Sequence, residues 1–189
     1  MGLDMYLTAD RYIGGWEHSA ERNEFERLVE MFGMEKFVTD ASPSAYVKFT
    51  VGYWRKANQI HSWFVRECQN DVDECQETEV AIEKLKELRS VCLEVMASTK
   101  LIPGEVHTST VFSAEHPKGA VTMEPGKIME DPTVAHELLA PEEGFFFGSQ
   151  DYDEWYWDDL KRTVAIVDRC IHLAEREGEW WDFQYRSSW

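Results

Sequence analysis

Aromatic rings and hydrogen-bonding side chains alternate in two stretches of the chain that lie far apart in the sequence. The candidate ligand-binding residues are Tyr53, Trp54, Arg55, Lys56, Asn58 and His61 in the first stretch, and Ser149, Tyr152, Asp153 and Trp155 in the second. Flat rings stack on bases or sugars, while guanidinium, ammonium and amide groups select phosphates, carboxylates or base edges. The sequence therefore predicts a site for a small nucleotide-like ligand, if the fold joins the two stretches around a cavity.

Core packing is the competing interpretation of these rings. Sixteen of the 25 aromatic residues fall within residues 53–64, 145–157 and 180–189. Aromatic side chains dominate the energetics of protein cores, so any single ring is more often buried than ligand-binding. We expect the run Phe145, Phe146 and Phe147 to fill the core.

His61 shares an apolar helical face with Ala57, Phe64 and Cys68. A histidine in such a place is usually buried and hydrogen-bonded to a carbonyl or a carboxylate, which is what we expect here. The alternative is an acid–base role with Asp153 as its partner. Ser149, just ahead of the last long helix, is expected to be the N-cap of that helix.

No recognisable catalytic motif accompanies these residues. The sequence contains no phosphate-binding Walker loop, no Gly-x-Gly-x-x-Gly, no His-Glu-x-x-His and no Gly-x-Ser-x-Gly. His107, His116 and His136 are too widely spaced to indicate a zinc site. We therefore expect no metal and no cofactor, and we favour binding over catalysis. A nucleotide-modifying hydrolase built on His61 stays as an alternative.

The net charge of −17 excludes some classes of partner. It repels phosphate backbones and anionic lipid heads, so we expect neither direct nucleic-acid binding nor membrane binding. The N-terminus shows no secretory signal and no apolar run could span a bilayer, which predicts a cytoplasmic protein. The four cysteines, Cys68, Cys75, Cys92 and Cys170, are expected to be reduced, and three of them to pack as small apolar side chains.

Periodicity predicts the elements that must position the candidate residues. Residues 3–13, 46–51 and 181–186 have the pattern of strands, whereas residues from 54, from 78 and from 150 onward have helical spacing. Another helix is expected between an N-cap at Ser19 and a C-terminal glycine at Gly33, and Thr78 is expected to cap a longer helix. A short helix is expected over residues 132–139.

These elements predict an α+β fold: a small, mostly antiparallel sheet with about four helices packed on it. Residues 1–189 are expected to form a single domain. Residues 100–131, which prolines and glycines punctuate, are expected to be an inserted β-hairpin or ordered loop. Within it, residues 106–112 and 120–123 are the expected strands.

Short motifs at both ends and in the middle of the chain carry a family resemblance. They are Met1–Leu7 (MGLDMYL), Tyr53–Asn58 (YWRKAN), Gly144–Ser149 (GFFFGS), Tyr152–Tyr156 (YDEWY) and Tyr185–Trp189 (YRSSW). Together they resemble a family of small acidic proteins of largely uncharacterised function that bacteriophages and prophages encode. Residues 100–131 look like an addition to the shorter family pattern. The resemblance implies a phage accessory protein that acts against host defence in the bacterial cytoplasm, and it assigns no chemistry to any residue.

Two further hypotheses about function stand beside the alternative of a nucleotide-modifying hydrolase. The first is a binding protein that captures a small nucleotide-like molecule without catalysis. The second is an acidic inhibitor of a host defence protein, similar to an anti-CRISPR protein or a DNA mimic, in which residues 100–131 would be the place to look for contacts. Acidic residues are spread evenly along the chain, which favours ordinary solubility over mimicry. Assembly into a homo-oligomer is left open.

Overall fold

The computed structural model describes residues 2–39, 41–111, 119–144, 147–176 and 180–189. Helices and strands are mixed along the chain, which confirms the α+β class. In chain order the elements are β1 (Asp4–Gly14), α1 (Arg22–Phe32), β2 (Ser44–Arg55), α2 (Asn58–Cys68), β3 (Thr78–Glu79), α3 (Ile82–Ser98), β4 (Leu101–Val111), β5 (Ala120–Met129), α4 (Thr133–Leu138), α5 (Glu154–Ala174) and β6 (Asp182–Ser188).

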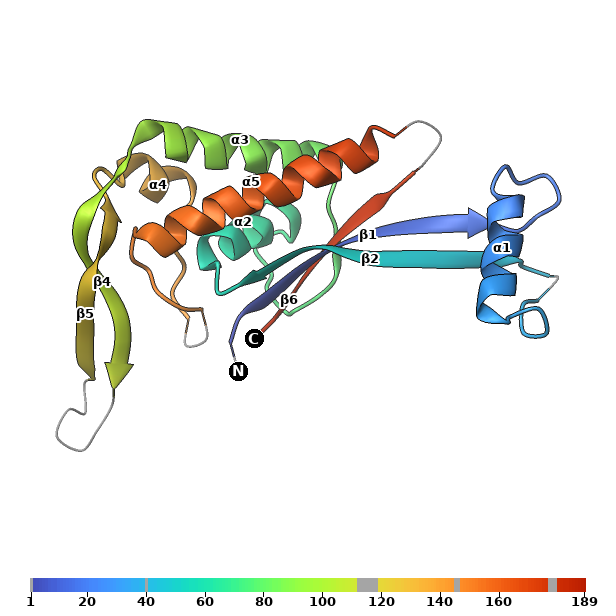
Figure 1. Cartoon of the computed structure of the whole chain (residues 1–189), viewed down its shortest axis with the longest axis horizontal. Coiled ribbons are helices and arrows are strands. Elements are labelled where there is room, and N and C mark those ends of the chain that lie inside the picture. The colour runs from blue at the N-terminus through green and yellow to red at the C-terminus, as the bar shows by residue number, and fades with distance from the viewer. Residues whose placement is uncertain (1, 40, 112–118, 145–146, 177–179) are drawn as a thin grey trace.

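The central sheet has four antiparallel strands in the order β2-β1-β6-β3. Side chains alternate along β1, so that Met5, Leu7 and Ala9 are buried while Tyr6 and Thr8 point to the other face. The buried face packs against the helices α2, α3 and α5, which lie together on one side of the sheet (Figure 1). This arrangement forms the main core.

Trp54 fixes the position of α5 on the sheet. Its ring is fully buried, and its Nε1 donates a hydrogen bond of 2.9 Å to Oγ1 of Thr163. A buried indole N–H needs such a partner, because leaving it unsatisfied would cost the desolvation energy of the donor. The contact joins the end of β2 to the middle of α5.

The outer halves of β1 and β2 extend beyond the core as a two-stranded ribbon. β6 pairs with β1 only as far as Asp10, whereas β1 and β2 continue to the pair Gly14 and Ser44. α1 sits at the end of this ribbon, away from the other helices (Figure 1). Its contacts with the ribbon include the buried ring of Phe25 and an ion pair of 3.0 Å between Arg11 and Glu24. We call the ribbon and α1 together the arm.

A second projection lies at the opposite end of the molecule (Figure 1). β4 and β5 form an antiparallel hairpin, which confirms the expected hairpin and extends both of its strands toward the core. The turn between them lies outside the described residues. The hairpin meets the core where the backbone N–H of Met129 donates to the carbonyl of Tyr152, next to the start of α5.

Two predicted helix starts are wrong. The first helix begins at Arg22 rather than beside Ser19, whose hydroxyl donates to the side chain of Glu21. Thr78 lies in β3, where it pairs with Tyr185, and α3 begins after Ala81. The predicted end of the first helix is confirmed, since Gly33 takes the left-handed conformation there. No helix in the described part of the chain is long and apolar enough to cross a membrane.

Candidate functional site

One open cleft of about 580 Å³ lies where the end of β2, the start of α5 and the base of the β4–β5 hairpin meet. Both aromatic-rich stretches predicted from the sequence contribute to it. Its lining residues are Arg55, Lys56 and Gln59 from the first stretch; Gly148, Ser149, Asp151, Asp153, Trp155 and Tyr156 from the second; and His107, Thr108, Asp158, Asp159 and Arg162.

Lys56 enters the cleft from an unusual backbone conformation. It has a φ of 61°, which lies in the left-handed region, and it follows directly on β2. That region costs a non-glycine residue roughly 1–2 kcal/mol. Gly148 faces it: its φ of 98° would strain any other residue, and an added Cβ would lie only 3.0 Å from Cβ of Lys56. The glycine lets the two stretches approach closely.

Asn58 does not line the cleft, and its prediction as a ligand-binding residue is not supported by its position. The side chain is buried, and its Nδ2 donates to the carbonyls of Phe147 (3.1 Å) and Ser149 (2.8 Å). Its Oδ1 accepts a hydrogen bond from the backbone N–H of Glu142. Asn58 therefore holds the segment that contains Gly148 and Ser149 against the end of β2.

Three predicted aromatic residues also lie outside the cleft. Trp54 is part of the core, as described above. Tyr152 is partly buried, and its ring lies 5.2 Å from that of Tyr156. Tyr53 is on the strand face away from α5, where its hydroxyl donates to Asp4 and its ring contacts Tyr6. Phe147 is buried in the core, while Phe145 and Phe146 lie outside the described residues.

Trp155 lines the cleft with about half of its surface exposed, whereas the neighbouring ring of Tyr156 is buried. Asp153 positions Trp155 by capping α5: its Oδ1 accepts hydrogen bonds from the backbone N–H groups of Trp155 and Tyr156 at 2.9 and 3.0 Å. This corrects the expectation that Ser149 is the N-cap. Ser149 instead donates its hydroxyl to Asp151 and accepts from the backbone N–H of the same residue.

Two carboxylates at the cleft are largely removed from water. Asp153 is almost completely buried, and its Oδ2 has no hydrogen-bond partner within the described residues. Burial raises the pKa of Asp153 and raises that of Asp159 to about 6. The amide of Gln59 donates to Asp159 at 3.3 Å, which opposes the second shift. Both carboxylates are therefore strong acceptors for a ligand that brings N–H donors.

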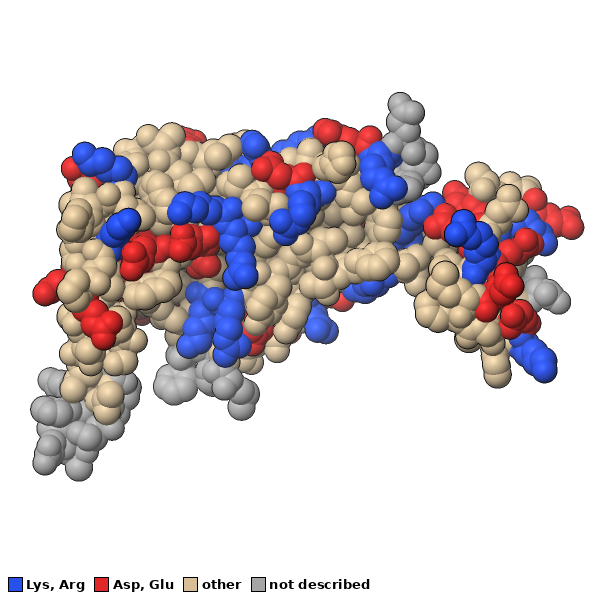
Figure 2. Space-filling model, in the orientation of Figure 1, with Lys and Arg blue, Asp and Glu red and all other residues tan. Residues whose placement is uncertain are grey.

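Basic groups lie beside these acids. Arg55 forms an ion pair of 2.8 Å with Asp4. Lys56 and Arg162 line the cleft without an acidic side chain within 4 Å in the described ranges. Figure 2 shows basic and acidic side chains next to one another over α5 and the end of β2. The cleft thus offers both signs of charge, and this face of the molecule is not uniformly acidic.

His61 is fully buried, as its apolar helical face predicted. Its Nδ1 lies 2.7 Å from the hydroxyl of Tyr185, and its Nε2 lies 3.0 Å from Oδ2 of Asp73. Asp73 also accepts from Nε1 of Trp189. The proposed pairing with Asp153 is wrong, because Asp73 occupies that role. His61 is therefore placed to hold the sheet to the loop after α2, and it does not line the cleft.

Sequence reasoning missed the contributions of α5 and the hairpin. Trp155, Asp159 and Arg162 follow at intervals of four and three residues, so they share one helical face that the sequence could have revealed. The periodicity assigns Gln59 to the polar side of its helix, opposite the apolar face, but the structure buries it beside Asp159. His107 and Thr108 carried no signal, since only the tertiary fold brings the hairpin beside α5.

The cysteines do not contribute to this site. Cys92 and Cys170 are buried, and burial raises the pKa of their thiols to about 12 and about 11. They pack as apolar side chains, as expected. Within the described ranges no group of three or more His, Cys, Asp or Glu side chains is arranged to hold a metal ion.

Comparison with known proteins adds no family to this description. A scan against protein-family models, a search of curated proteins and a search of solved structures found no match to the chain. The case for a function therefore depends on the geometry of the cleft.

Proposed function

We propose that the protein binds a small nucleotide-like ligand in this cleft without catalysing a reaction. The observation that carries the proposal is the meeting of four binding groups around one cavity. They are the half-exposed ring of Trp155, the cations Lys56 and Arg162, and the Oδ2 of Asp153. Among the described residues neither cation forms an ion pair within 4 Å, although the charge of Arg162 lowers the pKa of Asp159, and the Oδ2 of Asp153 has no hydrogen-bond partner.

Each group matches one part of a nucleotide. The ring of Trp155 provides a surface on which a base can stack. Lys56 and Arg162 can bind phosphate oxygens with charge-assisted hydrogen bonds. Asp153 and Asp159 can accept from ring N–H or amino groups, and a donor to Oδ2 of Asp153 would satisfy an atom that is otherwise buried without a partner. A base that presents two adjacent donors, as guanine does, fits such carboxylates best.

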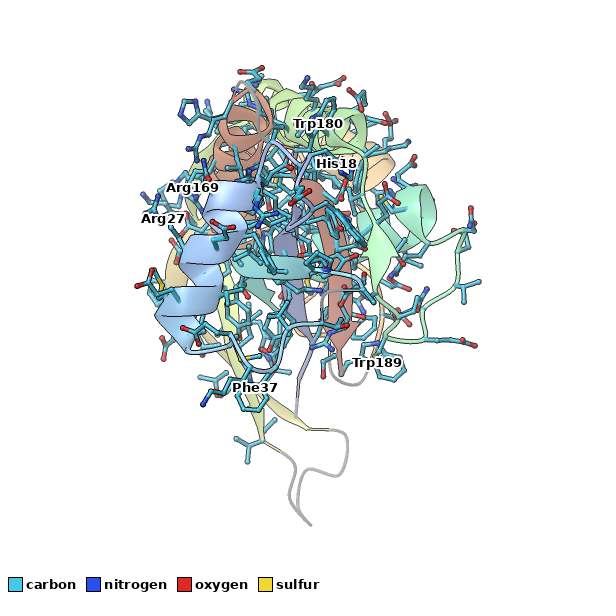
Figure 3. All side chains as sticks on the ribbon, turned by 90° about the vertical axis from the view of Figure 1, so that its right-hand side faces the viewer. His18, Arg27, Phe37, Arg169, Trp180 and Trp189 are labelled. Atoms are coloured by element: carbon cyan, nitrogen blue, oxygen red, sulfur yellow. The ribbon has the colours of Figure 1, made fainter. Side chains whose placement is uncertain are left out.

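The cleft also has room for a ligand larger than one nucleotide. Arg162 also lines a second, separate hollow of about 350 Å³ between α5 and β2. Arg169 lies at that hollow, one helical heptad further along α5, and Figure 3 shows it projecting outward. A second phosphate could therefore bind along α5, which favours dinucleotides or nucleotide sugars.

Binding without turnover is favoured because His61, the histidine within the two aromatic-rich stretches, is used in the core; the histidine that lines the cleft is His107 of the hairpin. His61 is fully buried and both of its ring nitrogens have partners. In the setting that the sequence motifs imply, a phage accessory protein in the bacterial cytoplasm, capture of a signalling nucleotide would counter host defence. That setting is part of the proposal.

Isothermal titration calorimetry tests the proposal with four probes: 3′,5′-cyclic GMP, 3′,5′-cyclic AMP, cyclic di-GMP and ADP-ribose. We expect saturable binding of at least one probe, strongest for a guanine dinucleotide. Absence of binding heat at two temperatures with all four probes would contradict the proposal, since two temperatures guard against a reaction enthalpy near zero.

Matched variants locate the binding. Trp155→Ala and Arg162→Ala remove groups at the cleft, while Trp180→Ala and Arg27→Ala remove exposed side chains of the same types elsewhere. We expect each cleft variant to weaken binding about tenfold, the effect of losing roughly 1.4 kcal/mol. The two distant variants should bind as the unmodified chain does.

A further inference from the structure

We infer that Asp73, which lies outside the cleft, is a positioning residue for it. The carboxylate of Asp73 accepts a hydrogen bond from each of two rings, those of His61 and Trp189. Both rings contact Phe147, the residue that precedes Gly148 of the cleft. The inference deepens the proposed function by naming what controls the shape of the cleft, and its effect on ligand affinity rests on that function.

One oxygen of Asp73 takes both of these hydrogen bonds. Nε2 of His61 lies 3.0 Å and Nε1 of Trp189 lies 2.9 Å from Oδ2. Because a carboxylate oxygen accepts, His61 donates from Nε2 in this contact. The hydroxyl of Ser187 donates to Oδ1 at 3.4 Å. His61 and Ser187 are buried, so loss of the carboxylate would leave their polar groups without this partner inside the protein.

The two rings that Asp73 holds both meet Phe147 edge to face. The ring centroids of His61 and Phe147 are 5.2 Å apart with an interplanar angle of 87°. Those of Trp189 and Phe147 are 6.1 Å apart with an angle of 72°. Such pairs attract because the positive edge of one ring meets the negative face of the other. The buried side chain of Phe147 is therefore fixed by one ring from α2 and one that follows β6.

Phe147 leads directly into Gly148 and Ser149, which line the cleft and which we call the cleft wall. Asn58 holds the main chain of this segment through the carbonyls of Phe147 and Ser149. The rings held by Asp73 fix the side chain of Phe147 instead. A binding site works when its groups are held within about 0.5 Å of their places. Loosening Phe147 should therefore disturb the cleft wall even while Asn58 keeps its contacts.

The loop that carries Asp73 has an unusual backbone. Asn70, Asp71 and Cys75 have φ angles of 54°, 60° and 56°, in the left-handed region that few residues other than glycine adopt. Such conformations persist where surrounding contacts fix them, and they gather at functional sites. Asp73 lies between these residues and joins the loop to α2 and to the end of β6. Its contacts are thus among those that hold the loop in shape.

Nuclear magnetic resonance tests the inference without a ligand. The heteronuclear ¹H–¹⁵N Overhauser effect of the Gly148 and Ser149 amides reports their ordering on the picosecond-to-nanosecond scale. We expect Asp73→Ala to lower it at both residues. Asp73→Asn should keep it, because an amide oxygen can replace Oδ2 as acceptor while the amide nitrogen faces Ser187. Glu74→Ala, at an exposed acid of the same loop, should change nothing.

Calorimetry with cyclic di-GMP measures the effect on the cleft. We expect Asp73→Ala to bind this probe about tenfold more weakly than the unmodified chain. Asp73→Asn and Glu74→Ala should bind it normally. Where Asp73→Ala fails to fold, Trp189→Phe takes its place: it removes one N–H donor at a half-exposed residue and keeps a ring beside Phe147. It should lower the Overhauser effect of the cleft wall, whereas Trp180→Phe should not.

Several results would overturn the inference. They are an unchanged Overhauser effect at the cleft wall in Asp73→Ala, or in Trp189→Phe where that variant replaces it, and an equal loss in Asp73→Asn or Glu74→Ala. If the unmodified chain binds cyclic di-GMP and Asp73→Ala binds it equally well, the inference fails and the proposed function stands. If no nucleotide binds the unmodified chain, the proposed function fails, and the Overhauser effect alone decides whether Asp73 positions the cleft wall.

Discussion

Individual side chains in the cleft divide into those that hold its shape and those left free for a ligand. Asn58 uses its amide to fix the segment around Ser149, and Asp153 uses one carboxylate oxygen to cap α5. Lys56 and the other oxygen of Asp153 have no such task within the described residues. The free groups are therefore the place where binding and stability can be separated by mutation.

Lys56→Gly should separate ligand binding from folding stability most clearly. Glycine relieves the cost of the left-handed backbone at this position but adds conformational entropy to the unfolded chain, and both effects are about 1 kcal/mol. We expect the unfolding free energy in urea to change by less than about 1 kcal/mol, while the affinity for the nucleotide that binds in the calorimetric test falls about tenfold. A variant that unfolds readily would show that Lys56 has a structural role, and one that binds normally would show that Lys56 does not contact the ligand.

Asp159→Asn tests the buried carboxylate. Burial raises the pKa of Asp159 from its ordinary value of 3.8 to about 6. Between these values the folded state holds a proton that the unfolded state has lost, so the contribution of Asp159 to stability falls as the pH rises from about 4 to about 6. We expect the variant to be more stable by about 2 kcal/mol at pH 7 and equal in stability near pH 3.

Urea unfolding of the unmodified chain and of Asp159→Asn between pH 3 and pH 7 measures the difference in their unfolding free energies. An equal stability at pH 7, or a variant that is less stable there, would mean that water reaches Asp159 or that Arg162 compensates its charge. The remaining charged groups near Asp159 are Asp153 and Asp158, which both favour its protonation.

At the scale of elements, the β4–β5 hairpin contributes to the cleft, and among the described residues Val106 and Met129 are its buried apolar side chains. It supplies His107 and Thr108, and it contacts the start of α5 through β5. Gly104 and Gly126 face each other across the hairpin. A two-residue Asn-Gly turn between them would therefore remove the outer hairpin and keep its base.

We expect this replacement of residues 105–125 to fold with unchanged helices and to bind nucleotide more weakly. Circular dichroism and calorimetry measure the two properties. Loss of the cooperative unfolding transition would show that the hairpin stabilises the core, and unchanged affinity would show that His107 and Thr108 do not touch the ligand.

The sequence predicted elements better than contacts. Alternation in β1 and the apolar faces of α2 and α5 follow from local burial, so these elements were predictable from residue type and spacing. The helix starts at Ser19 and Thr78 were not, because any of several polar residues can serve as a cap and tertiary packing chooses among them. The joining of residues near 55 and 150 was a hypothesis, and the cleft places Lys56 against Gly148 as it required.

The roles within the cleft were harder to predict. Asn58, Trp54 and His61 have the chemistry of ligand-binding residues, but each of them has a buried partner that lies about 90 or more residues away. Residue type cannot distinguish a polar group that binds a ligand from one that satisfies the core. The prediction that Phe145 and Phe146 fill the core concerns two residues outside those that the structure describes.

The whole molecule is extended, with an open cleft near one end and an apolar arm at the other (Figure 1). The charge of −17 is spread over the chain.

The most direct test of the central claim is the nuclear magnetic resonance signal of the Trp155 indole N–H, assigned by its loss in Trp155→Phe. On addition of cyclic di-GMP or another binding nucleotide, we predict a saturable shift of this signal together with the backbone amide signals of Lys56 and Arg162, and no shift at Trp180. Shifts confined to residues outside the cleft, or none with any nucleotide, would contradict the account.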